Sequence, residues 1–221
     1  MRNALTPSVL IALALSFARA TTCLAGPPID IDGVFDDWDG VAVLARTLTR
    51  VFRHAGDFST FRGTDWGRPV DPARHRGHRF LGYLQNHDQV GNRALGDRIG
   101  AVLSPGRLAA GAAVVLTAPF TPMLFMGEEW AASTPWRFFT DHDAELGALV
   151  SAGRRAEFGS HGWAAQDVPD PQDPATFEAS RLDWAEPDKD LGARMLDWYR
   201  RLIALRRAEP DLLADDLRDV E

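Results

Sequence analysis

Residues 80–93, Phe-Leu-Gly-Tyr-Leu-Gln-Asn-His-Asp-Gln-Val-Gly-Asn-Arg, decide how the fold of this chain is interpreted. The first five residues form a short apolar run with polar neighbours, which predicts a buried strand. That strand leads directly into the polar sequence Gln-Asn-His-Asp at 85–88. We therefore expect hydrogen-bonding and ionisable side chains to gather where this strand ends.

A second strand is predicted at Met123–Met126, an apolar run followed by Gly-Glu-Glu-Trp at 127–130. Between the two runs, residues 107–117 are small and branched apolar residues after a Ser-Pro-Gly start signal, which predicts a helix. Strand, helix and strand in succession are typical of a parallel α/β sheet, with its functional groups at the carboxyl ends of the strands. Because two strands cannot complete such a sheet, we expect the chain to form part of a larger barrel.

The rest of the chain contains more helices and long loops. Apolar residues at spacings of three and four predict helices over about 41–52 and 190–208, and a short helix over 145–158. Residues 56–78 are rich in Gly, Arg, Asp and Pro, which predicts a long loop. The segment 133–187 is expected to be irregular around its short helix, because prolines punctuate it.

Five motifs in the same order resemble those of the alpha-amylase superfamily of glycoside hydrolases. They are Leu-Gln-Asn-His-Asp-Gln-x-Gly-Asn-Arg at 84–93, Pro-Met-Leu-Phe-Met-Gly-Glu-Glu-Trp at 122–130, Phe-Phe-Thr-Asp-His at 138–142, Gly-Arg-Arg-x-Glu-Phe at 153–158 and Ser-Arg-Leu-Asp-Trp at 180–184. The closer resemblance is to the malto-oligosyltrehalose trehalohydrolases, and it covers about residues 43–210. It implies an α/β fold that is a partial (β/α)8 TIM barrel, with segments matching roughly helix 6 to helix 8 and truncated at both ends.

The resemblance implies that Asp88 is the catalytic carboxylate that stabilises the transition state, and that His87 hydrogen-bonds the same sugar ring. The physical reason is that positive charge develops at the anomeric carbon, where a preorganised carboxylate binds the distorted sugar more tightly than the ground state. From the residues alone, the alternative is a polar turn in which Asn86 and Asp88 cap backbone groups. The collinear motifs favour the sugar-binding role.

Other substrate-binding residues implied beside this pair are Asn86, Gln89, Arg93, Glu129 and Trp130. Arg93 either pairs with an acid or contacts sugar, and both alternatives stay open. Trp130 either stacks on a glucose ring or packs in the core, as aromatic residues at this density often do. No cofactor is implied. No metal is expected either, because the closely spaced His75 and His78 are flanked by arginines and lack nearby acids.

Retaining hydrolysis needs two more carboxyl groups about 5 Å apart, one as nucleophile and one as general acid/base. The resemblance places them after the fourth and fifth barrel strands, and the chain contains no match to either motif. Glu128 and Glu129 are adjacent carboxylates that could raise one pKa by repulsion, but the resemblance gives them a supporting role. We therefore expect the chain on its own to lack turnover and to need the missing barrel portion.

The activity implied is hydrolysis of the α-1,4-glucosidic bond next to the trehalose unit of malto-oligosyltrehalose or a related α-glucan, which releases trehalose. Two alternatives are an exported glucan-binding protein that does not cleave its ligand, and a 1,4-alpha-glucan branching enzyme. Nucleic acid is an improbable partner, because 31 acidic residues against 24 basic ones give a formal charge of −7. No membrane span is predicted, because Pro119 and Pro122 interrupt the apolar stretch 108–126.

The chain is divided by sequence into four segments. Residues 1–25 resemble a secretory signal, with Arg2, an apolar run and a small-x-small site at 18–20. Residues 26–40 are an acidic linker or edge segment, 41–210 the partial barrel, and 211–221 the start of a truncated C-terminal segment. A secretory signal conflicts with the cytoplasmic location that the resemblance implies, and the conflict stays open.

Overall fold

The computed structural model describes residues 40–60, 62–160 and 162–220. The predicted signal segment 1–25 and nearly all of the acidic segment 26–40 lie outside these residues. The described chain consists of helices, 3-10 turns and four very short strands, all of which lie before residue 123. Their order is α2 (Gly40–Arg50), β1 (Asp57–Ser59), β2 (Thr64–Trp66), η3 (Gly77–Arg79), β3 (Leu81–Gly82), α3 (His87–Gly91), η4 (Ile99–Ala101), α4 (Pro105–Thr117), β4 (Thr121–Pro122), η5 (Glu128–Trp130), α5 (Ala144–Ser160), η6 (Ala165–Asp167), α6 (Pro174–Glu178), η7 (Glu186–Asp188), α7 (Asp190–Ala208) and α8 (Pro210–Leu213).

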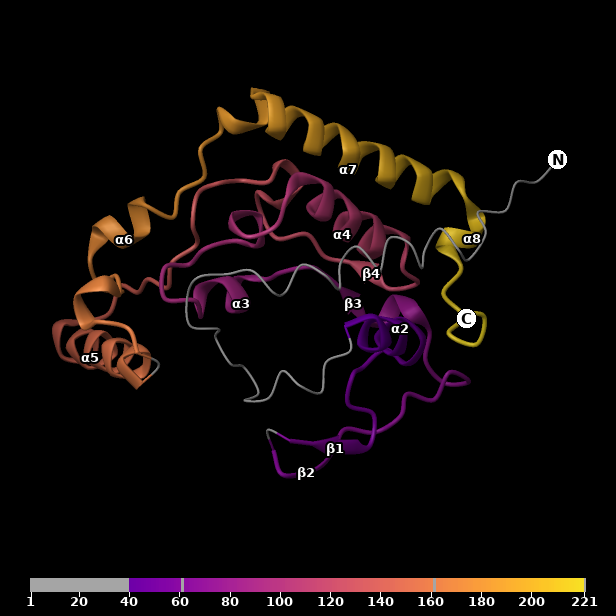
Figure 1. Cartoon of the computed structure of the whole chain (residues 1–221), viewed down its shortest axis with the longest axis horizontal. Helices are drawn as coiled ribbons and strands as arrows, with labels where there is room; N and C mark the ends of the chain where they lie inside the picture. The colour runs from indigo at the N-terminus through magenta and orange to yellow at the C-terminus, as the bar shows by residue number, and fades with distance from the viewer. Residues whose placement is uncertain (1–39, 61, 161, 221) are drawn as a thin grey trace.

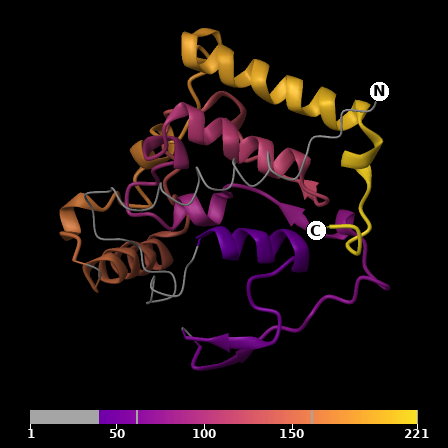
Figure 2. The same cartoon turned by 45° about the vertical axis from the view of Figure 1, so that its right-hand side comes forward.

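Helices α4 and α7 form the main core, and both were predicted from sequence. In Figures 1 and 2, α7 runs along α4, and the two strands β3 and β4 lie on the other side of α4. Helix α4 begins at Pro105. Proline has no backbone N–H, but this costs nothing at the first helical position, where an N–H would have no partner within the helix. The residues that meet between the two helices are buried and apolar apart from one hydroxyl. They are Leu108, Ala112, Ala113 and Leu116 of α4, with Met195, Tyr199 and Leu202 of α7.

Two polar side chains of α7 fix it to the chain around α4. Trp198 donates its indole N–H to the carbonyl oxygen of Ala109 at 2.9 Å. Arg206 donates to the carbonyl oxygens of Leu116, Ala118 and Phe120 at 2.7–2.9 Å. Since the last carbonyls of a helix have no partner within it, Arg206 supplies one where α4 ends and the chain enters β4.

Strands β3 and β4 are parallel and are joined through α4, which confirms the predicted strand, helix and strand. Leu81 is opposite Thr121, and Gly82 is opposite Pro122. The predicted extents are wrong: the second strand precedes 123–126, and the first is two residues long and not buried, with Leu81 58% exposed. Within the described residues, each of these strands pairs only with the other, so the remaining edge of each strand has no strand beside it.

Part of the predicted loop 56–78 is an antiparallel hairpin, so that prediction is wrong for β1 and β2. Asp57 pairs in register with Trp66, and Arg46 of α2 forms an ion pair with Asp57. Gly67, at φ 77°, lets the chain pass the carbonyl oxygen of His54, which a Cβ would approach to 2.3 Å. Three-residue strands contain too little alternation to be recognised from sequence.

The segment 133–187 is more helical than predicted. Helix α5 spans 17 residues and is longer than the expected 145–158, and α6 was not predicted at all. Both lie at the end of the molecule opposite to α8 and the C-terminus (Figures 1 and 2). Phe158 of α5 packs with Ala94 and Val168, so α5 covers the chain that follows α3.

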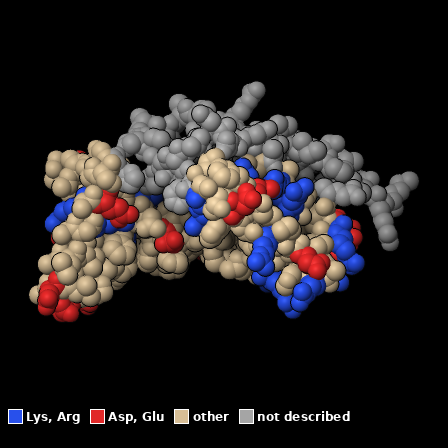
Figure 3. Space-filling view, turned by 90° about the horizontal axis from the view of Figure 1, so that it is seen from below, with Lys and Arg blue, Asp and Glu red and all other residues tan. Residues whose placement is uncertain are grey.

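Charged side chains of both signs lie next to one another over one face of the molecule (Figure 3). Ion pairs such as Arg93 with Asp97 and Arg155 with Asp170 bring charges of opposite sign together on the surface. Such partly exposed pairs contribute little to stability. No helix in the described part of the chain is long and apolar enough to cross a membrane.

Candidate functional site

The segment after β3 carries the predicted site, and its backbone is fixed by its own side chains. Gln85 is buried, and its Oε1 accepts a hydrogen bond from the backbone N–H of Ile99 at 3.1 Å. Asn86 is extended and caps α3, with its Oδ1 accepting from the backbone N–H of Gln89 at 2.8 Å. Because this cap satisfies a free N–H at the helix start, α3 begins at His87.

His87, Asp88 and Gln89 occupy the first turn of α3, and all three are exposed. Asp88 Oδ1 accepts a hydrogen bond from the side-chain amide of Asn92 at 3.0 Å. The Asp88 carboxylate is therefore held by a side chain one helical turn away, while it stays open to solvent. The alternative that both residues cap backbone groups therefore holds for Asn86, which accepts from a backbone N–H. It does not hold for Asp88, whose carboxylate accepts from a side chain.

The loop after α3 is closed by two local contacts. Arg93 Nε donates to Asp97 Oδ2 at 2.8 Å, so the structure pairs Arg93 with an acid. Gly96, at φ 65°, lies where a Cβ would come within 2.3 Å of the carbonyl oxygen of Trp136. The N–H of Trp136 in turn donates to the carbonyl oxygen of Gly96 at 2.7 Å. This part of the loop requires glycine.

Glu128 lies behind this segment, on the 3-10 turn that follows β4. Its side chain is 6% exposed, and Tyr199 of α7 donates its hydroxyl to Glu128 Oε1 at 3.0 Å. Burial raises the pKa of Glu128 to about 7, although the hydrogen bond from Tyr199 opposes the shift. Repulsion from Glu129 is the smallest cause, so the predicted effect of adjacent carboxylates is minor beside desolvation.

Arg98 is a buried cation whose charge interacts with that of Glu128. It is 3% exposed and donates from Nε to the carbonyl oxygen of Thr134 and from Nη1 to that of Met126. Burial lowers its pKa, and the charge of Glu128 acts in the opposite direction. Both side chains stabilise the loops that follow β3 and β4.

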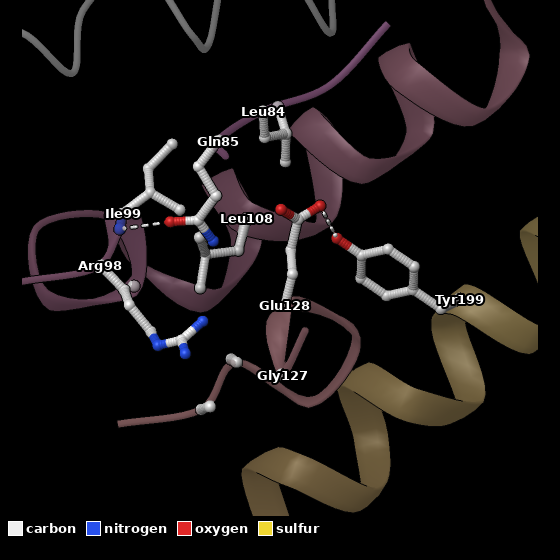
Figure 4. Close-up of a pocket in the computed structure, with 11 residues that line it drawn as sticks. Leu84, Gln85, Arg98, Ile99, Leu108, Gly127, Glu128 and Tyr199 are labelled. Carbon is white, nitrogen blue, oxygen red and sulfur yellow. Dashed lines mark hydrogen bonds between the residues drawn. The ribbon is translucent and has the colours of Figure 1, made fainter. Parts of the chain in front are cut away.

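Gln85, Arg98, Glu128 and Tyr199 line the same small cavity of about 10 Å³ (Figure 4). A cavity of this size has room for about one water molecule and not for a sugar ring. Figure 4 shows that Gln85 and Glu128 approach it from neighbouring loops, with Tyr199 entering from α7. This cluster therefore connects the base of the His87–Asp88 segment to the core, and a ligand would have to bind on its outer side.

The structure brings the predicted residues together in two groups, one on α3 and one on η5. Glu129 is half-buried on η5, beside Glu128. Trp130 is 5% exposed, and its ring lies 5.3 Å from that of Trp184 between centroids, so the structure packs it in the interior. No face of Trp130 is open for a sugar to stack on.

Arg98 and Tyr199 were not predicted from the sequence as parts of the site, whereas Gln85 was predicted only as part of the polar sequence that follows the first strand. Tyr199 lies between Met195 and Leu202 in the apolar pattern that predicts the helix over 190–208. The hydroxyl of Tyr199 on an apolar helix face could have indicated this contact, because a buried hydroxyl needs a hydrogen-bond partner.

The two histidines with metal-like spacing have other contacts. His78 Nδ1 hydrogen-bonds Asp215, and the ring of His75 lies against that of Phe80. Among the described residues, no group of three or more His, Cys, Asp or Glu side chains is placed to hold a metal ion.

No protein-family model matches the chain, but curated relatives do. A malto-oligosyltrehalose trehalohydrolase of Brevibacterium helvolum is 51% identical over 181 residues, which are 81% of this chain and 31% of the relative. That of Arthrobacter ramosus is 50% identical over 195 residues, 85% of this chain and 34% of the relative. That of Saccharolobus solfataricus is 34% identical over 176 residues, 79% of this chain and 29% of the relative. The chain thus spans about a third of the length of the curated relatives it matches.

A solved structure gives the same result for the fold. A crystal structure of a candidate alpha amylase from Salmonella typhimurium superposes with a TM-score of 0.73 and 36% identity, covering 80% of this chain and 30% of that one. The described residues therefore have the mixed helix and strand fold of part of an alpha-amylase-type protein. Within them, the strands do not form a closed barrel.

Proposed function

We propose that this chain, a homologue of one part of the malto-oligosyltrehalose trehalohydrolases, forms the section of a glycoside-hydrolase barrel that binds the sugar whose bond is broken. The observation that carries the proposal is the position of His87 and Asp88. They lie on the first turn of α3, which begins five residues after the end of β3, the strand that pairs in parallel with β4, and both are exposed. In this proposal the described fold corresponds to roughly helix 6 to helix 8 of a (β/α)8 barrel.

Asp88 acts in the proposal as the carboxylate that stabilises the transition state. Positive charge develops at the anomeric carbon as the α-1,4 bond beside the trehalose unit breaks, and a fixed carboxylate stabilises that charge more than it stabilises the ground state. Asn92 holds Asp88 in place, so little reorganisation is needed when the charge develops. His87, next to it on the same turn, is proposed to hydrogen-bond a hydroxyl of the same ring.

The nucleophile and the general acid are proposed to come from another section of the barrel. Glu128 is a poor substitute for either, because it is enclosed and hydrogen-bonded to Tyr199. The relatives that carry the activity in their names are about three times longer than the matched segment. The exposed side chains of Leu81 on β3 and of Tyr83 just after it also support a covering partner, because they leave apolar surface open to solvent.

A chimera tests this proposal directly. The matched 181 residues of the Brevibacterium helvolum relative are replaced by those of this chain, and trehalose release from maltotriosyltrehalose is measured by chromatography. The chimera is expected to release trehalose, and Asp88→Asn is expected to slow it by about 100-fold or more. The matched control is Asp167→Asn, which changes an exposed aspartate on η6. A chimera that folds and binds substrate but is unaffected by Asp88→Asn would contradict the role given to Asp88.

The same product analysis also distinguishes hydrolysis from transfer. Free trehalose indicates that water accepts the glycosyl group, as proposed. New α-1,6 linkages in the product would instead show a branching reaction and would overturn the proposed specificity.

A further inference from the structure

The Gly-Arg-Arg-x-Glu-Phe motif at 153–158 lies on α5, outside both the His87–Asp88 segment and the cavity behind it. Its first arginine, Arg154, lies on α5 and is 7% exposed. The guanidinium Nη2 donates to the carbonyl oxygen of Gly91 and, at 3.2 Å, to that of Arg93. These two carbonyl groups are at the C-terminal end of α3, more than 60 residues away in sequence.

Helix α3 needs such a partner because it has only five residues. A helix this short is not stable by itself, and no N–H within the helix donates to its last carbonyl groups. Asn86 caps its N-terminal end, as described above. Arg154 satisfies carbonyl groups at the other end, so α3 is held at both ends by side chains.

The carbonyl groups that Arg154 holds flank the residue that holds Asp88. Asn92 lies between Gly91 and Arg93, and its side-chain amide donates to Asp88 Oδ1 at 3.0 Å. A shift of residues 91–93 therefore moves the group that orients the Asp88 carboxylate. Arg154 reaches Asp88 only through this backbone and this amide.

Arg154 is itself rigidly placed. Its guanidinium lies 4.4 Å from the ring centroid of Phe158 and 5.2 Å from that of Phe138. Phe158 belongs to the buried cluster with Ala94 and Val168. Burial lowers the pKa of Arg154, and Glu157, with its carboxylate 3.7 Å away, acts in the opposite direction. An arginine keeps its charge in such a site and offers several donors in fixed geometry.

We propose that Arg154 is a positioning residue: from α5 it holds the C-terminal end of α3 and so fixes the orientation of Asp88 toward the sugar. It contacts backbone carbonyl groups and not the substrate. The consequence for sugar binding rests on the proposed function of Asp88, whereas the restraint on α3 exists with or without sugar. The two parts are therefore measured separately.

The restraint is tested on the full chain by hydrogen exchange at the backbone amides of residues 89–93. Arg154→Gln is expected to speed their exchange about tenfold or more, the effect of losing a charged hydrogen bond, while amides of α7 keep their rates. Arg154→Lys keeps the charge but not the forked donors, and is expected to restore part of the protection. The matched control is Arg155→Gln on the same helix, where the side chain is exposed and pairs with Asp170.

The consequence is tested by calorimetry with maltotriosyltrehalose on the same four proteins. Arg154→Gln is expected to weaken binding about tenfold, Arg154→Lys less, and Arg155→Gln not at all. Unchanged exchange at 89–93 in Arg154→Gln, fast exchange there already in the unmodified chain, or equal loss of protection in α7 would each overturn the restraint. If Arg154→Gln does not fold, the partial loss in Arg154→Lys decides the question.

The two failures are distinguishable. If the unmodified chain binds no sugar, the proposed function fails, and only the exchange rates test whether Arg154 restrains α3. If the chain binds sugar and Arg154→Gln binds it equally well despite faster exchange, Arg154 does not position Asp88.

Discussion

Replacing Glu128 by Gln is expected to remove a specific pH dependence from the stability of this protein. Burial raises the pKa of this carboxyl group from 4.5 to about 7 in the folded state. As pH rises above 4.5, the unfolded chain ionises at this group before the folded chain does, which favours unfolding. The stabilisation is therefore complete below pH 4.5 and is lost as pH rises toward 7.

The size of this effect follows from the difference between the two pKa values. One pKa unit corresponds to about 1.4 kcal/mol, so the unmodified chain should lose about 3 kcal/mol of unfolding free energy between pH 4.5 and 7.5 through this group. In Glu128→Gln the group does not ionise, and this contribution disappears. The amide still accepts the hydroxyl of Tyr199, so the substitution keeps the hydrogen bond.

Urea unfolding followed by tryptophan fluorescence at several pH values measures the effect. The difference between the unmodified chain and Glu128→Gln isolates this group from the other titrating residues. Glu178→Gln, at an exposed glutamate of α6, serves as the matched control and should follow the unmodified chain. Parallel curves for the unmodified chain and Glu128→Gln from pH 4.5 to 7.5 would refute the reasoning.

Three further substitutions test other contacts in the fold. Tyr199→Phe removes the hydroxyl that donates to the Glu128 carboxyl group and should destabilise the chain by about 1–3 kcal/mol in urea unfolding. The loss should be larger at pH 8 than at pH 5, and equal losses at the two pH values would count against an ionised acceptor. Arg206→Met leaves three carbonyl groups without their donor and should lower the unfolding free energy by about 2 kcal/mol or more, whereas Arg200→Met, exposed on the same helix, should have little effect. Gly96→Ala places a Cβ against a carbonyl oxygen at a residue with positive φ and should lower the melting temperature. Gly153→Ala, in open space on α5, should raise the melting temperature or leave it unchanged. A melting temperature higher for Gly96→Ala than for Gly153→Ala would show that the turn tolerates a side chain.

The two core helices, α4 and α7, were predictable because their signals are local, whereas the four- and five-residue helices α3, α6 and α8 were not predicted. Helix α7 coincides with the predicted 190–208, and α4 begins two residues before the predicted 107–117. In both cases the apolar residues that form the pattern lie within the helix itself, and α4 also has its Ser-Pro-Gly start signal at 104–106. The hairpin β1–β2 was not predictable, because its strands are too short for a period to be read.

The strands and their burial were predicted less well than their order. An apolar run indicates what could be buried, but the described residues provide no neighbour to cover Leu81 on β3. Tertiary context therefore decides both strand length and burial here. The parallel pairing was still predictable, because α4 connects the two strands.

The exposed part of the candidate site was found from one contiguous motif, whereas its support was not. Asn86, His87 and Asp88 are adjacent, so the resemblance could identify them together. The supporting Tyr199 and Arg154 come from helices far along the chain. Their contacts depend on how α7 and α5 pack, which no local pattern encodes.

The central claim is that Asp88 faces a sugar, and isothermal titration of the full chain with maltotriosyltrehalose tests it most directly. We expect measurable binding by the unmodified chain and binding weakened about tenfold or more by Asp88→Asn, because the substitution removes a charged hydrogen-bond acceptor. Equal affinity of the two proteins, with Asp88→Asn correctly folded, would contradict it.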